Sequence, residues 1–154
     1  MILINQLGSY FAAKKTDIAE IKNVVVVVSQ EHLADTIRNA TQWPALIVVV
    51  PGAKTDARNE DNIRDSSHVV LLLVEKADLK NLPQSGIIGL MSTLQVLMER
   101  LKVQMVNDMM NHSTPGHLMH DLDVNSIITE PEYNYPGTYG WSMGFDINPT
   151  LRQL

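Results

Sequence analysis

The clearest pattern in the sequence lies near its end, where large apolar residues alternate with small or polar ones from residue 139 to residue 147. An alternation with a period of two predicts a β-strand with one large apolar face and one almost bare face. Residues 127–133 can pair with this strand through a turn that contains Pro136 and Gly137, which suit a type II turn. The sequence therefore predicts a C-terminal β-hairpin. The large residues of its last strand are Tyr139, Trp141, Met143, Phe145 and Ile147, and the bare face carries Gly140, Ser142, Gly144 and Asp146.

The rest of the chain carries patterns of both helices and strands. Apolar residues at three- and four-residue steps predict a helix that runs from Leu3 to about Lys14 and a long amphipathic helix over residues 87–110. A second helix is expected from Ser29 until just before Pro44. Short aliphatic runs predict further strands at residues 24–28, 45–50 and 68–75. We therefore expect a single α+β domain over residues 1–154, with a mixed or antiparallel sheet flanked by the N-terminal helix and the long helix.

Composition excludes several classes of protein. The chain has 154 residues and no cysteine, which rules out disulfides, thiolate metal sites and cysteine nucleophiles. Its longest aliphatic runs, at residues 45–50 and 69–74, fall far short of the roughly 20 residues that cross a bilayer, so we expect no membrane contact. The net charge of −5 argues against specific binding of nucleic acid. All of that excess charge lies in residues 103–154.

A strongly polar segment separates two of the predicted strands. Residues 51–67 contain seven charged side chains of both signs and one sizeable aliphatic residue, Ile63. Such a segment cannot bury enough apolar area to order itself alone, so we expect an exposed polar arm or loop. Its mixed charge suits reciprocal salt links with a neighbouring copy. The candidate contact residues are Lys54, Asp56, Arg58, Glu60 and Arg64.

Catalytic and metal-binding patterns are weak. The Pro51-Gly52-Ala53-Lys54-Thr55 stretch lacks the glycines of a phosphate-binding loop. A turn with His117, His120 and Asp121 could hold a metal ion, although exposed side chains near a helix end explain it more simply. Glu130 and Glu132 share one face of a strand without an apolar pocket to shift their pKa values. We expect no catalytic residue, no cofactor and no metal.

The closing hairpin offers a candidate contact surface instead. Small residues on its bare face would let another backbone approach closely, and the last strand could lie at a sheet edge, where unpaired amides invite a partner strand. An alternative is that the glycines only relieve twist and the arm is only solvated. The candidate contact residues of the hairpin are Gly140, Trp141, Ser142 and Gly144.

In the order of these elements the chain resembles the tail terminator and tail-completion proteins of tailed bacteriophages and contractile injection systems. The resemblance rests on the N-terminal helix, the Trp43-Pro44-Ala45-Leu46 strand start, the polar arm that leads into His68-Val69-Val70-Leu71, the long helix after Gly86 and the closing residues 139–147.

Members of that family are small α+β subunits that form rings, commonly hexameric, and cap the tail tube or join it to the head or neck. The resemblance implies a non-enzymatic ring protein of a virion or injection-system particle, assembled in the bacterial cytoplasm. Its partners would be other copies of itself, the tail tube or sheath, and neck or connector proteins. In such a ring the acidic residues after the long helix would make one rim or the lumen acidic, and assembly would depend on salt.

A second function stays open, because the strand at residues 24–28 and the helix that follows it also fit a βαβ unit. Ligands of α/β domains bind beyond the carboxyl ends of parallel strands. This alternative predicts a small-ligand or nucleotide site at Ser29, Gln30, Pro51 and Gly52.

Overall fold

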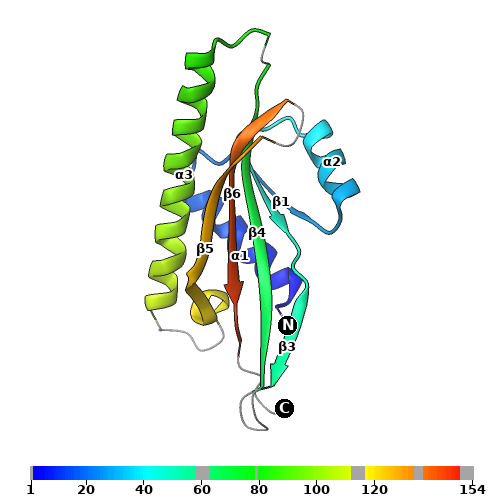
Figure 1. Ribbon diagram of the computed structural model, residues 1–154, viewed down its shortest axis with the longest axis vertical. Coiled ribbons are helices and arrows are strands. Elements are labelled where there is room, and N and C mark those ends of the chain that lie inside the picture. The colour runs from blue at the N-terminus through cyan, green and yellow to red at the C-terminus, as the bar shows by residue number, and fades with distance from the viewer. Residues whose placement is uncertain (1, 58–62, 79, 112–116, 134–136, 150–154) are drawn as a thin grey trace.

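The computed structural model describes residues 2–57, 63–78, 80–111, 117–133 and 137–149. Its elements confirm the predicted α+β class (Figure 1). Among these residues, no helix combines the length and the apolar character that a membrane span requires. The elements follow the order α1 (Ile4–Asp17), β1 (Asn23–Val27), α2 (Gln30–Asn39), β2 (Ala45–Val49), β3 (Ala53–Ala57), β4 (Ile63–Lys76), α3 (Gln84–Met110), a short 3-10 helix η1 (Leu118–Asp121), β5 (Leu122–Glu132) and β6 (Thr138–Ile147).

The strands form one mixed sheet in the order β1-β2-β4-β6-β5, and β3 lies off this path and pairs with the first residues of the middle strand, β4. β1 and β2 are parallel and are joined through α2, so the βαβ unit considered from the sequence is present. The remaining strand pairs are antiparallel. Aliphatic residues fill β2 because both of its faces are covered, and four of its five residues are buried.

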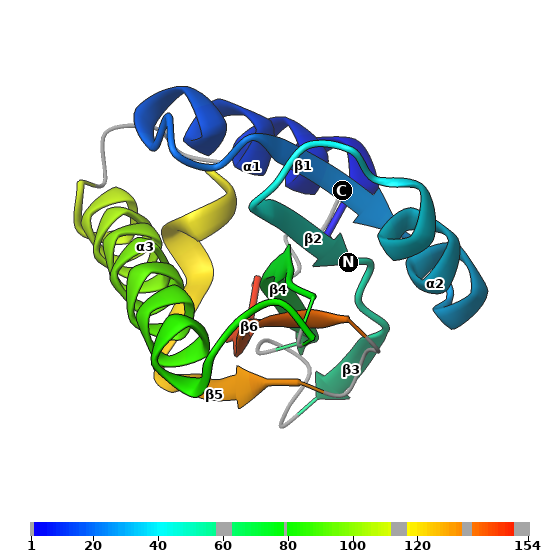
Figure 2. The ribbon, with the colours of Figure 1, turned by 90° about the horizontal axis from the view of Figure 1, so that it is seen from above.

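Helices cover the two faces of the sheet unequally. Figure 2 shows α1 and α3 on one side of the sheet and α2 on the other side. The larger core lies under α1 and α3, where residues such as Phe11, Leu101 and Phe145 are fully buried. The smaller core lies under α2 and joins Leu33 and Ile37 to residues of β1, β2 and β4.

The long helix α3 packs its inner stripe into the larger core as the sequence predicted. Its buried residues are Leu94, Leu97, Met98, Leu101 and Met105. Met119 and Met143 are also fully buried, so these methionines fill the core. Trp141 fixes the helix to the sheet, because its indole Nε1 donates a hydrogen bond to the Met91 carbonyl at 2.9 Å.

Three expectations from the sequence need correction. The predicted loop within residues 51–67 is a β-hairpin, since β3 pairs with β4 from Ala53 opposite Ser67 to Ala57 opposite Ile63. The last strand does not lie at a sheet edge, because β6 pairs with β4 on one side and with β5 on the other. Its neighbour β5 begins at Leu122, before residue 127, where we expected the first strand of the hairpin to start.

The C-terminal hairpin itself is confirmed, with Glu130 opposite Ser142 and Ile128 opposite Gly144. Gly137 has a φ of 75°, the backbone conformation that the third position of a type II turn requires. Residues 134–136, which complete this turn, lie outside the described residues.

Candidate functional site

The polar arm is a two-stranded extension of the sheet. β6 reaches only as far as Ser67 on one side of β4, and β2 pairs only with residues 70–74 on the other side. The first four residues of β4 therefore pair with β3 alone among the strands, and the hairpin extends from one end of the molecule (Figure 1). Midway along the β3–β4 pair, the Thr55 hydroxyl donates a hydrogen bond to the Asp65 carboxylate at 2.7 Å.

The predicted contact residues of the arm are only partly described. Lys54 is exposed on β3. The register places Asp56 directly opposite Arg64, so two residues of opposite charge occupy cross-strand positions. Arg58 and Glu60 lie outside the described residues.

The predicted contact residues of the closing hairpin have mostly internal roles. A Cβ atom at Gly140 would stand 1.9 Å from the Leu73 carbonyl oxygen, so the backbone that approaches this glycine is that of β4. At Gly144 a Cβ atom would stand 3.1 Å from the His68 imidazole, whose Nδ1 contacts the Asp146 carboxylate at 2.7 Å. Trp141 faces the opposite side, toward α3. Ser142 remains partly accessible and contacts the Glu130 carbonyl at 3.4 Å.

The outer edge of the closing hairpin is β5, which the sequence did not single out. Because the sheet order ends with β5, one side of this strand has no strand partner in the described part of the chain. Val124 and Ile128 on this strand are exposed apolar residues, and the register shifts between Asp123 and Ile128. An edge of this kind is open to strand addition, although a bulge of this type limits the length over which a new strand can pair.

Four of the six carboxylates after residue 102 share one face of the closing hairpin. The register aligns Asp123 with Asp146, Glu130 with Ser142 and Glu132 with Gly140, and cross-strand partners lie on the same face of a sheet. That face is opposite the one that α3 covers. The other two carboxylates, Asp108 and Asp121, lie on α3 and η1.

Asp108 belongs to a polar network that joins α1 to α3. Its carboxylate accepts hydrogen bonds from the Tyr10 hydroxyl and the Lys14 ammonium, each at 2.6 Å. Burial alone would raise the pKa of Asp108, but the hydrogen bonds from Lys14 and Tyr10 outweigh it and hold the pKa below its usual range. Burial, together with the bond to Asp108, raises the pKa of Tyr10 far above its usual value. The charges of Lys14 and Asp108 therefore neutralise each other, as in a structural ion pair, and the Tyr10 hydroxyl stays protonated.

The candidate metal ligands do not converge. The His117 Nδ1 accepts a hydrogen bond from the Met119 amide at 3.3 Å, and its ring packs edge-on against Tyr10. The His120 Nδ1 contacts the adjacent Asp121 carboxylate at 3.1 Å. Within the described ranges, no three His, Asp or Glu side chains form a group that could hold a metal ion.

The loops required by the small-ligand alternative do lie side by side. Ser29 and Gln30 follow β1, Pro51 and Gly52 follow β2, and the Val50 amide donates a hydrogen bond to the Val27 carbonyl at 2.9 Å. Ser29 is already engaged as the N-cap of α2, where its hydroxyl accepts a hydrogen bond from the His32 amide.

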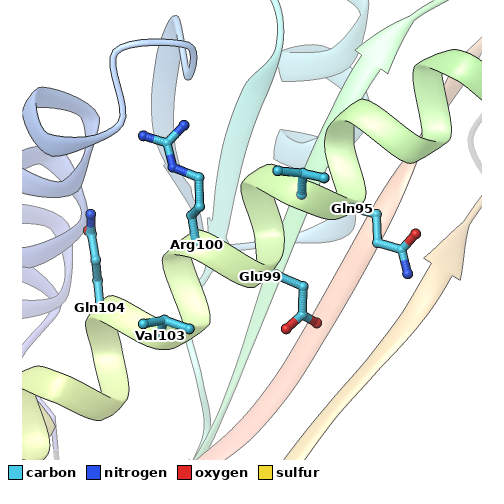
Figure 3. Close-up of a pocket in the computed structure, with 6 residues that line it drawn as sticks. Gln95, Glu99, Arg100, Val103 and Gln104 are labelled. Carbon is cyan, nitrogen blue, oxygen red and sulfur yellow. The ribbon is translucent and has the colours of Figure 1, made fainter.

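A further surface, missed in the sequence, runs along the outer face of α3. A groove of about 520 Å³ lies over Gln95, Val96, Glu99, Arg100, Val103 and Gln104 (Figure 3). A second groove, of about 380 Å³, begins at the same Val103 and continues between α3 and β5 toward Val124 and Ile127. The seven-residue interval between Val96 and Val103 was a signal for this surface, but the stronger inner stripe of the same helix obscured it.

Comparison with known proteins gives no family assignment. The chain matches no protein-family model, and a search of curated proteins finds no similar sequence.

Proposed function

We propose that the chain is a non-enzymatic structural subunit of a phage-like tail, which forms a ring that caps the tail tube or joins it to the neck or head. The observation that carries the proposal is the arm formed by β3 and the start of β4. The arm continues β4 past the last residues that pair with β2 and β6, and Lys54 on its described part is exposed. The resemblance in element order to tail terminator proteins supports the same function.

In this proposal the contact between subunits is heterologous. The arm of one copy lies against the body of the next, and repetition of that contact by rotation closes a ring. The edge of β5 is a suitable receiving surface, because β5 is a long strand and, within the described ranges, ends the sheet order on the side away from β1 and β2. The ring would stop tube growth by its geometry alone and would need no cofactor.

The acidic face of the closing hairpin predicts that the protein which binds the ring has a basic surface. Asp123, Asp146, Glu130 and Glu132 would lie on one rim or in the lumen and meet a basic surface of a tail tube, sheath or connector protein. Such an interaction weakens as salt rises, because ions screen exposed charges. The complete particle, a virion or an injection system, would be the site of function.

Deletion of the arm tests whether this segment is needed to form the ring. Ala53 and Ser67 are cross-strand partners, so an Asn-Gly turn in place of residues 54–66 closes the hairpin at its base. We expect the full chain to form a ring visible by negative-stain electron microscopy, and the shortened chain to lose it while it keeps its circular dichroism spectrum. Lys54→Ala, a single change at the surface of the arm, serves as the mild control. A full chain that stays monomeric at high concentration would contradict the proposal.

The parallel β1-α2-β2 unit favours a small-ligand or nucleotide site as the second candidate. Its loops meet at the carboxyl ends of two adjacent parallel strands, the position at which α/β folds bind ligands. A rise in melting temperature with ATP or GTP, abolished by Gly52→Val, would favour this function over the ring.

A further inference from the structure

The outer face of α3 carries apolar residues that point directly away from the core. Val96 and Val103 are seven residues apart, which is about two helical turns, and so lie one above the other on the helix. Met110 follows after a further seven residues. The exposed fractions of these three residues are 60%, 55% and 62%, while Leu94, Leu101 and Met105 on the opposite side of the helix are fully buried.

Nothing in the described part of the molecule covers this face. In Figure 2, α3 forms one side of the molecule, and no other described element lies beyond it. Apolar residues that recur every seven residues return to the same side of a helix, so these three residues form one stripe along which a second helix can lie. Val103 lines both grooves, one of which lies along α3 and the other between α3 and β5.

The charged residues next to this stripe, one on each flank, are Glu99 and Arg100, which are opposite in sign. Figure 3 shows Gln95 and Glu99 on the flank toward β5, and Arg100 and Gln104 on the other flank. Arg100 donates a hydrogen bond to the Glu20 carboxylate at 2.7 Å, which fixes its flank as the one near the end of α1. Glu99 pairs with Lys102 on its own flank. The stripe therefore has an acidic side chain on one flank and a guanidinium on the other, at the same height along the helix.

We propose that the outer face of α3 binds the same face of a second copy of this chain, with the two helices parallel and related by a two-fold axis. In this arrangement Val96 and Val103 meet their own equivalents. The Glu99 flank of each helix faces the Arg100 flank of the other, so the contact contains two reciprocal Glu99–Arg100 salt bridges. The guanidinium has five N–H donors, so Arg100 can keep its bond to Glu20 and also bind Glu99 of the second copy.

The direction of the helices follows from the charges. If the two helices were antiparallel, the same two-fold geometry would place the Glu99 flank against the Glu99 flank and the Arg100 flank against the Arg100 flank. Like charges in contact oppose association, whereas opposite charges favour it. A second copy in the parallel direction is therefore the occupant that this surface fits.

This contact goes beyond the proposed ring. An isologous contact joins two copies only, so it cannot close a ring of more than two subunits, and it would instead join two rings or hold a dimer. The arm is not part of the contact. Loss of the arm and loss of the α3 contact therefore have different effects on the size of the assembly, and each proposal can fail without the other.

Cysteine cross-linking tests the contact directly, because the chain contains no cysteine of its own. Parallel helices in this register bring equivalent stripe positions within the Cα separation of about 4.4–6.8 Å that a disulfide spans. We expect Val96→Cys and Val103→Cys each to form a disulfide-linked dimer under mild oxidation, roughly tenfold faster than a chance collision allows. Val28→Cys is the matched control, since Val28 is 66% exposed and lies far from α3 at the end of β1.

Two results would overturn the proposal. In the first, neither variant cross-links faster than Val28→Cys, which would mean that this face does not meet its equivalent. In the second, a dimer forms only when Val96→Cys and Val103→Cys are mixed, which would mean that the helices are antiparallel.

Charge reversal provides a second, independent readout by sedimentation velocity. Glu99→Arg alone, or Arg100→Glu alone, places like charges together, and we expect each to weaken self-association at least tenfold. The double variant E99R/R100E restores opposite charges across the contact and should recover most of the affinity. Glu20→Gln removes only the contact of Arg100 within its own chain and should leave self-association unchanged. If the double variant associates no better than the single variants, the reciprocal salt bridges do not exist.

Discussion

The inner and the outer face of α3 carry similar apolar residues in different surroundings. Leu94, Leu101 and Met105 on the inner face are fully buried against the sheet and α1, whereas Val96 and Val103 on the outer face are mostly exposed. Residues of the first kind stabilise the fold of a single chain by their removal from water. Residues of the second kind contribute little to that fold, and they form the surface that we propose binds a second copy of the chain.

The largest expected effect on stability comes from a comparison of two glycines of β6, one packed against β4 and one next to an exposed side chain. Gly140→Ala would place a Cβ atom 1.9 Å from the Leu73 carbonyl oxygen, so β4 and β6 must move apart. We expect a loss of more than about 4 kcal/mol in the free energy of unfolding, measured by urea denaturation. Gly144→Ala is the matched control, because its new atom meets only the exposed His68 ring, and it should cost about 1 kcal/mol or less. Equal losses at the two glycines would contradict the structure of this strand pair.

The second prediction compares the two faces of α3 directly. Leu101→Ala removes a fully buried side chain and should lower the free energy of unfolding by about 2–5 kcal/mol. Val103→Ala changes an exposed side chain and should cost no more than about 0.5 kcal/mol at a protein concentration low enough to keep the chain monomeric. A large loss from Val103→Ala in the monomer would mean that the outer face is part of the fold and is not a contact surface.

The third prediction concerns the partly buried ion pair between Lys14 and Asp108, which links α1 to α3. Asp108→Asn removes the nearer of two carboxylates that contact the Lys14 ammonium, the other being Asp17 at 3.6 Å, and should cost about 1–3 kcal/mol near pH 7. Asp35→Asn, in an exposed pair with Arg38, should cost almost nothing.

The same ion pair predicts a dependence on pH. The pKa of Asp108 is lower in the folded chain than in the unfolded chain, so its stabilisation is complete above the unfolded value of about 3.9 and disappears as pH falls through the folded value. Thermal unfolding between pH 6 and pH 2 should therefore show a smaller difference between the wild type and Asp108→Asn at the acid end. A constant difference across this range would contradict the assignment.

Local patterns explain how much of the fold was predictable. The alternation around Trp141 and Phe145 marks a strand with one buried face, and the inner stripe of α3 marks a helix, because side chains on one face meet one core. The hairpin between Ala53 and Ser67 escaped prediction because backbone hydrogen bonds hold it, and these depend little on its charged side chains. The internal position of β6 depends on pairing with β4, which lies about 70 residues earlier in the chain.

The candidate surfaces were less predictable because they too depend on contacts between distant parts of the chain. Gly140 and Gly144 suggested a bare face open to partners, and the structure shows that β4 approaches the first glycine and His68 the second. The outer residues Val96 and Val103 became recognisable as a surface only when the opposite side of the helix was seen to be buried. A sequence pattern indicates that a residue is apolar, but the position of the core decides whether that residue is covered.

The central claim, that this chain assembles with copies of itself, is tested most directly by its mass in solution. Sedimentation equilibrium of the wild type should give a closed assembly far heavier than the 17.2 kDa chain. Val103→Glu, which places a charge in the α3 contact, should halve that mass as paired rings separate into single rings. A mass of 17.2 kDa at every concentration would contradict both the ring and the α3 contact.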